Sequence, residues 1–120
     1  MNIFQQFFAY FRLREAVRKA DEAHRLSRRR FYVLPGAGGS LVVMDRANFR
    51  ILKRKGYIAP NAFVSDAAFE SFYFTPHADG SGRLSGPARR RKARQYFSWY
   101  QNRLKEAQKR KRDGKIRREK

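Results

Sequence analysis

SGPARRRKARQYFSWYQNRLKEAQKRKR, residues 85–112, has the pattern of a long helix that packs along one side. Ser85 or Gly86 can serve as its N-cap, which places Pro87 in the first turn, where the missing N–H of proline costs nothing. The apolar side chains fall in one stripe roughly 100° wide, as expected of a face that packs on a core. The stripe consists of Ala93, Tyr96, Phe97, Tyr100, Leu104 and Ala107. We therefore expect the rest of the chain to fold against this helix.

The chain of 120 residues carries a net charge of +19, and this charge is unevenly placed. Residues 85–120 hold 15 basic and 3 acidic side chains, and residues 28–58 hold 8 and 1. Self-repulsion of this size opposes compaction, so a polyanionic partner is the natural source of compensation. Because cations beside phosphates release counterions without reading the bases, the charge predicts sequence-independent binding of nucleic acid, either DNA or RNA.

Two groups of cations are candidates for contacts with phosphates. The first, on the helix 85–112, consists of Arg89, Arg90, Arg91, Lys92, Arg94, Arg103, Lys105, Lys109, Arg110, Lys111 and Arg112. The second consists of Arg28, Arg29, Arg30, Lys53, Arg54 and Lys55, which would extend the same surface if the chain folds back on the helix. Trp99 lies off the apolar stripe, so it can either stack on a base or lie against a neighbouring element.

Residues 2–29 contain no Gly or Pro and predict a second long helix, whose apolar side changes direction along its length. Leu13, Ala16, Val17, Ala20 and His24 lie roughly opposite the aromatic first half, which contains Ile3, Phe4, Phe7, Phe8 and Phe11. Three interpretations of this aromatic half are open. It can cover the core of its own domain, it can dock on another subunit through Phe4, Phe7, Phe8 and Phe11, or it can bind a membrane surface. The acidic residues that follow disfavour the membrane.

The middle of the chain predicts short elements. Residues 31–34 and 41–44 read as a β-hairpin around a Gly-rich loop, and their continuous apolar runs indicate cover on both faces. Asp45 can cap a helix over 46–55 that ends at Gly56, with Phe49 and Leu52 facing inward. Ser65 can cap a short helix that carries Ala68, Phe69 and Phe72, and residues 73–76 read as a strand before a turn over 77–82. The fold class is therefore α+β, a single domain over 1–112 followed by a basic tail, 113–120, which we expect to order only on a partner.

Enzyme chemistry and cofactor binding are not expected. The loop PGAGGS, residues 35–40, lacks the Lys of a phosphate-binding loop and precedes a strand instead of a helix. His24 and His77 have no second ligand at metal-site spacing, and the chain has no cysteine. No hydroxyl group stands in a pattern that recruits a base, so no catalytic residue is assigned. Without an apolar run long enough to span a bilayer or a secretory signal, we expect a cytoplasmic protein, or one packaged in a particle made in the cell.

Three segments of the chain are distinctive: RFYVLPGAGGSLVVMDRANFRILKRKGYI, SFYFTP and QYFSWYQNRL. Through them the chain resembles small, basic, uncharacterised proteins of tailed phages and prophages. The resemblance implies a minor virion or packaging component and carries no functional residues across. Two functions therefore remain open. One is sequence-independent nucleic-acid binding, and the other is a structural role in which the aromatic helix docks on a subunit while the basic helix faces genome or an acidic neighbour.

Overall fold

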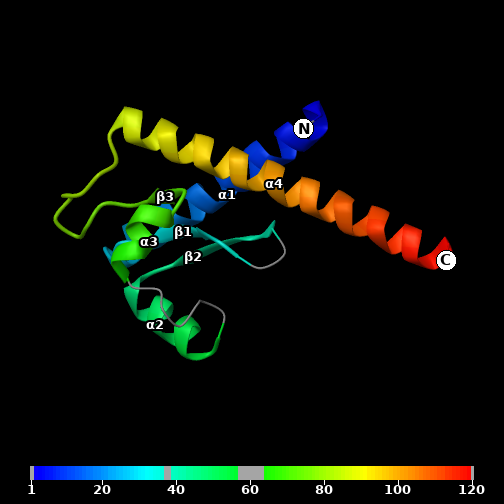
Figure 1. Cartoon of the computed structure of the whole chain (residues 1–120). Coiled ribbons are helices and arrows are strands. Elements are labelled where there is room, and N and C mark those ends of the chain that lie inside the picture. Colours follow the sequence, from blue (N-terminus) through cyan, green and yellow to red (C-terminus); the bar gives the residue numbers. More distant parts are fainter. Residues whose placement is uncertain (1, 37–38, 57–63, 120) are drawn as a thin grey trace.

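The computed structural model describes residues 2–36, 39–56 and 64–119, and these form an α+β fold (Figure 1). This confirms the predicted fold class. The elements in chain order are α1 (Ile3–Ser27), β1 (Tyr32–Pro35), β2 (Leu41–Met44), α2 (Arg46–Arg54), α3 (Val64–Glu70), β3 (Tyr73–Phe74) and α4 (Gly86–Glu119).

A three-stranded antiparallel sheet with the order β2-β1-β3 lies at the centre. The predicted hairpin forms β1 and β2, with Tyr32 opposite Met44, and the predicted strand at residues 73–76 forms β3, with Tyr32 opposite Phe74. The rings of Tyr32 and Phe74 lie 6.2 Å apart across this pair, a contact that favours the register.

Both faces of the sheet are covered, as the continuous apolar runs predict. On one face, Ala16 and Ala20 of α1 pack with Val33 and Tyr73. On the other face, Tyr32, Leu34 and Met44 pack with Phe49 of α2 and Ala67 of α3. Small alanines on α1 allow the helix to approach the sheet closely, so Val33 is fully buried on that face.

The helix ends follow the local sequence signals. Asn2 and Gln5 form a capping box at the start of α1, and the Asp45 carboxylate accepts a hydrogen bond of 2.8 Å from the Asn48 N–H at the start of α2. Gly56, with φ +83°, follows α2 as expected. The helix predicted over 2–29 ends at Ser27, because the next residue, Arg28, adopts the left-handed conformation with φ 61°.

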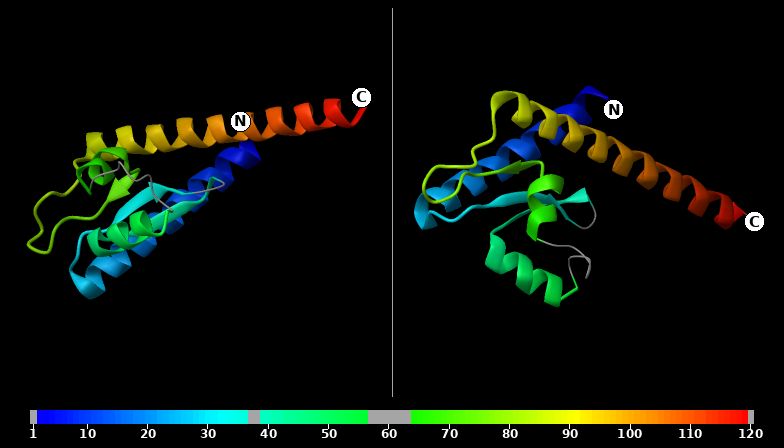
Figure 2. Two further views of the ribbon diagram at one scale, coloured as in Figure 1. Left: turned by 60° about the horizontal axis from the view of Figure 1, so that its bottom comes forward. Right: turned by 60° about the vertical axis from the view of Figure 1, so that its left-hand side comes forward.

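α4 crosses α1 and then extends beyond the body of the protein (Figures 1 and 2). Ser85 is its N-cap, since its hydroxyl oxygen accepts from the Ala88 N–H at 3.1 Å. At the crossing Tyr96 is fully buried, and its hydroxyl donates to the Ala9 carbonyl oxygen of α1 at 2.7 Å. The predicted stripe packs at this crossing from Ala93 to Tyr100, whereas Ala107 is exposed.

Two expectations about these elements need correction. Ser65 lies inside α3, which begins at Val64, so it is not the N-cap, and Phe72 follows the helix, which ends at Glu70. Within α3, Ala67 is buried and Phe69 is 79% exposed. α4 also continues past Arg112 to Glu119, and Gly114, a residue of low helix propensity, lies within this part of the helix. The expectation that 113–120 orders only on a partner stays a prediction.

Candidate nucleic-acid interface

The exposed cations of α4 form a basic surface along most of the helix. Among the described side chains, those exposed are Arg89, Arg90, Arg91, Arg94, Arg103, Lys105, Lys109, Arg110, Lys111 and Arg112. Glu106 is paired with Arg103 at 3.7 Å, and Asp113 is the other acidic side chain described on this helix. These guanidinium and ammonium groups are solvated and offer long, flexible donors to phosphate oxygens.

Lys92 does not belong to this surface, which corrects the prediction for that residue. Its ammonium donates to the carbonyl oxygens of Ala68 at 2.9 Å, Phe69 at 3.2 Å and Ser71 at 2.8 Å, and so closes the C-terminal end of α3. An ammonium has three donors, so none remains for a phosphate. Burial, and to a smaller degree the charge of Arg30, lower the pKa of Lys92.

Trp99 is part of the packing between elements, as the second of its two interpretations proposes. Its ring lies 5.3 Å from the Phe72 ring and 6.1 Å from the Tyr96 ring, measured between centroids. The guanidinium of Arg103 lies 5.7 Å from its centroid. With one side on the core and a cation over the ring, the indole positions Arg103 and has little open surface for a base.

The second group of cations reaches α4 at one place. The guanidinium of Arg30 lies 4.1 Å from the Phe74 ring centroid, and the Lys92 ammonium lies 5.3 Å from the same centroid. Arg30 also donates to the Gly82 carbonyl oxygen at 3.3 Å and contacts His77. Both cations at this junction are therefore engaged within the protein. The basic segment 53–55 lies at the end of α2, across the sheet from α4 (Figure 1), so it does not extend the α4 surface.

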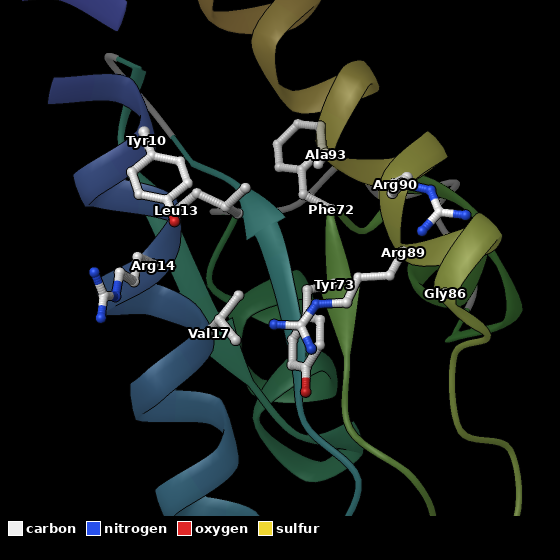
Figure 3. A pocket seen from close by; sticks show the side chains of 10 residues that line it. All are labelled: Tyr10, Leu13, Arg14, Val17, Phe72, Tyr73, Gly86, Arg89, Arg90 and Ala93. Atoms are coloured by element: carbon white, nitrogen blue, oxygen red, sulfur yellow. The ribbon is translucent and has the colours of Figure 1, made fainter. Parts of the chain in front are cut away.

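A groove of about 380 Å³ separates α1 from the start of α4 (Figure 3). Its floor is apolar, with Leu13 and Val17 of α1 facing Phe72 and Ala93, and Arg14, Arg89 and Arg90 stand at its rim. This arrangement joins an apolar surface to Arg89 and Arg90 of the basic surface on α4 and to Arg14 of α1.

Tyr73 also lines the groove and ties the sheet to α1. Its hydroxyl donates to the Asp21 carboxylate at 2.6 Å, and the Arg89 guanidinium lies 5.0 Å from its ring centroid. Burial first, and then the hydrogen bond to Asp21, raise the pKa of Tyr73 to about 12. The phenol therefore stays protonated at neutral pH and acts as a structural donor.

The aromatic half of α1 does not cover the core of its own domain, so that interpretation is wrong. Ala9 is the residue that packs there, and the larger side chains point away from it. Exposed fractions are 76% for Ile3, 73% for Phe4, 65% for Phe7, 57% for Phe8 and 51% for Phe11. The buried positions of α1 lie on the opposite side of the helix, which matches the predicted change of direction.

Arg46 and Arg50 are cations that the sequence analysis did not select. Together with Arg28, Arg29 and Arg30 they line a hollow of about 620 Å³, which we call the arginine hollow. The signal was present in the sequence, since two arginines four residues apart directly after a capping Asp must lie on one face of a helix start. The sequence could not show that this face of α2 lies beside the end of α1.

Comparisons with protein-family models, with curated proteins and with solved structures give no match. In the part of the chain that the structure describes, no group of three or more potential metal ligands is found. Within the same residues no helix is long and apolar enough to cross a membrane.

Proposed function

We propose that this chain is a non-enzymatic protein that binds nucleic acid, DNA or RNA, without reading its sequence. The observation that carries the proposal is the run of exposed arginines and lysines on α4, with few acidic side chains among them. A helix from Gly86 to Glu119 is about 50 Å long at 1.5 Å per residue, so its cations can follow several phosphates of one backbone.

The shape of the protein supports this proposal. α4 stands out from the body beyond its crossing with α1 (Figure 2), so its distal cations are accessible from several sides. Nucleic-acid backbones are recognised by such accessible cations, whereas reading of bases requires side chains held in fixed positions against base edges. The distal cations, Lys105 to Arg112, are exposed and have no hydrogen-bond or ion-pair partner within the part of the chain that the structure describes.

A fluorescence polarisation titration with labelled oligonucleotides of two unrelated sequences tests this function. We expect similar affinity for both sequences, and a log–log decrease with salt of roughly 0.7 to 0.9 per neutralised phosphate between about 50 and 200 mM salt. A double Lys105→Gln and Lys109→Gln variant should bind more weakly and show a smaller slope. Absence of binding at about 50 mM salt, or affinity that does not change with salt, would refute the proposal.

A structural or assembly role, for instance as a minor virion protein, is the second candidate, and the exposed aromatic side of α1 favours it. Apolar patches of this kind are uncommon on monomeric soluble proteins and mark contact surfaces. In this proposal Phe4, Phe7, Phe8 and Phe11 dock on a subunit while α4 faces a genome or an acidic neighbour, in the cytoplasm or inside a particle.

Light scattering after size exclusion distinguishes this second role. With wild-type protein we expect a mass above that of one chain in the presence of the partner or of further copies, and a return to one chain for Phe7→Asp combined with Phe8→Asp. A wild-type protein that stays monomeric and shows no tendency to associate argues against docking through this helix.

A further inference from the structure

The arginine hollow lies where three segments distant in sequence meet. The end of α1 contributes Arg28, Arg29 and Arg30, the first turns of α2 contribute Arg46 and Arg50, and the turn after β3 contributes His77. The hollow has a volume of about 620 Å³ and is open to solvent. It is separate from the groove beside α4, with which it shares no lining residue.

The charge inside the hollow is not balanced. Among the described residues that line it, Asp45 is the one acidic residue, and its carboxylate already accepts from the Asn48 N–H at 2.8 Å and from Arg29 at 3.3 Å. The side chains of Arg28, Arg46 and Arg50 have no hydrogen-bond or ion-pair partner within the described residues. Several guanidinium groups around one concavity repel each other unless an anion occupies it.

Two further features distinguish these arginines from ordinary surface cations. Arg28 adopts φ 61°, a left-handed conformation in which glycine is the usual residue and any side chain adds strain. Arg30 is fixed from several sides, by the Phe74 ring, by the Gly82 carbonyl oxygen and by His77, and its buried Nε has no partner. Strain at one arginine and immobilisation of another are features of preorganised binding sites.

We propose that the arginine hollow binds a phosphate group. Guanidinium groups present paired N–H donors that match two phosphate oxygens, and several of them around one concavity favour a doubly charged anion over chloride. The free cations come from the end of one helix and the start of another, so a phosphate there joins α1 to α2. The proposal does not depend on nucleic-acid binding by α4, because none of its residues lies on that helix.

Titration with inorganic phosphate at constant ionic strength, followed by two-dimensional amide NMR, tests the site directly. We expect saturable shifts of residues that line the hollow, such as Ser27, Ala47 and Ala78. Arg46→Gln combined with Arg50→Gln should weaken phosphate binding at least about tenfold, since it removes charge-assisted hydrogen bonds. The matched control is Arg90→Gln with Arg94→Gln, which removes the same charge at the same spacing from α4 and should leave these shifts unchanged.

Arg28→Gly separates binding from folding. Glycine relieves the left-handed strain, so this variant should be at least as stable as wild type and yet bind phosphate several-fold more weakly. The proposal is overturned if wild-type shifts do not saturate, or if the α2 and α4 double variants lose phosphate binding equally.

Binding of oligonucleotides with and without a 5′-phosphate, compared between wild type and the Arg46→Gln and Arg50→Gln variant, identifies the source of the phosphate. If the hollow takes a backbone phosphodiester, the Arg46→Gln and Arg50→Gln variant loses affinity for both oligonucleotides and its salt slope falls by roughly 0.7 to 0.9. If it takes a terminal phosphate, only the phosphorylated oligonucleotide loses affinity. If both bind as to wild type while the phosphate shifts are lost, the ligand is a free phosphate compound. Failure of α4 to bind any oligonucleotide would refute the proposed function and leave the phosphate titration to decide this site.

Discussion

Replacement of Lys92 by Met tests whether this cation serves the fold instead of a ligand. Met keeps the length of the side chain and removes the ammonium that reaches the carbonyl oxygens of Ala68, Phe69 and Ser71. These three acceptors are affected unequally. Ala68 keeps a hydrogen bond of 3.1 Å from the Ser71 hydroxyl, and Phe69 is exposed so that water can replace the donor. The carbonyl of Ser71, a fully buried residue, loses the only side-chain donor that it has in the structure.

The magnitude follows from this difference. One buried carbonyl left without a donor costs about 1 to 3 kcal/mol, and part of this cost is offset because the variant no longer has to desolvate an ammonium group on folding. We expect Lys92→Met to lower the free energy of unfolding by about 2 kcal/mol, measured by urea denaturation. The matched control is Lys105→Met on the exposed part of the same helix, which should change stability by less than about 0.5 kcal/mol.

We expect the effects on nucleic-acid affinity to be the reverse of the effects on stability, with the larger change in Lys105→Met. Lys105→Met should weaken binding and reduce its salt slope, while Lys92→Met, measured under conditions where it is folded, should bind as wild type. Equal stability of the two variants would show that the contacts to α3 contribute nothing. A loss of nucleic-acid affinity in Lys92→Met alone would show that Lys92 belongs to the binding surface, contrary to our reasoning.

Three further predictions concern the core, the turn after β3 and the response to pH. Phe49→Ala should cost about 3 to 5 kcal/mol of stability because Phe49 is 4% exposed, whereas Phe69→Ala, at 79% exposed, should change stability by less than about 0.5 kcal/mol in the same urea titration. Gly82→Ala should destabilise more than Gly80→Ala: both glycines have positive φ, but a Cβ at Gly82 would lie 2.9 Å from a histidine carbon and one at Gly80 meets nothing within 4 Å. Because the pKa of Tyr73 is raised from 10.0 to about 12, the unfolded chain releases this proton first, so stability should be full below pH 10 and fall as pH rises toward 12; denaturation at stepped pH should show a smaller fall for Tyr73→Phe.

Local signals account for most of the fold that the sequence predicted. Asp45, Ser85 and Gly56 act within a few residues of their own position, so their roles as caps and terminator follow from residue type and spacing. The hairpin and β3 are marked by short apolar runs between turn residues. The same reasoning failed at Ser65, because α3 begins at Val64 and so includes the residue that was expected to cap it.

The candidate sites depend on contacts between distant segments, and these were less predictable. Charge alone could not separate Lys92 from its basic neighbours, since its partners lie more than twenty positions earlier in the chain. Arg46 and Arg50 stood outside the selected blocks because their importance comes from the approach of α2 to the end of α1. The helical angle correctly predicted that Phe4 and its aromatic neighbours lie on the side of α1 opposite to Ala16 and Ala20. Whether anything covers them depends on where α4 crosses α1.

The crossing of α1 and α4 separates a packed part of α4 from an exposed part, and both parts carry cations. Up to Tyr96 and Trp99 the helix is held by aromatic packing, so its cations there stand on a rigid support. Beyond Leu104 no side chain is buried among those described, while Lys105, Lys109 and Arg112 lie close enough to line one shallow hollow. Like charges at a spacing of four residues destabilise a helix, so this half is held by backbone hydrogen bonds against repulsion. A polyanion would remove that repulsion, and binding and helix stability would then reinforce each other. Because α4 continues to Glu119, the order that we expect for the tail on a partner would be one consequence of this coupling.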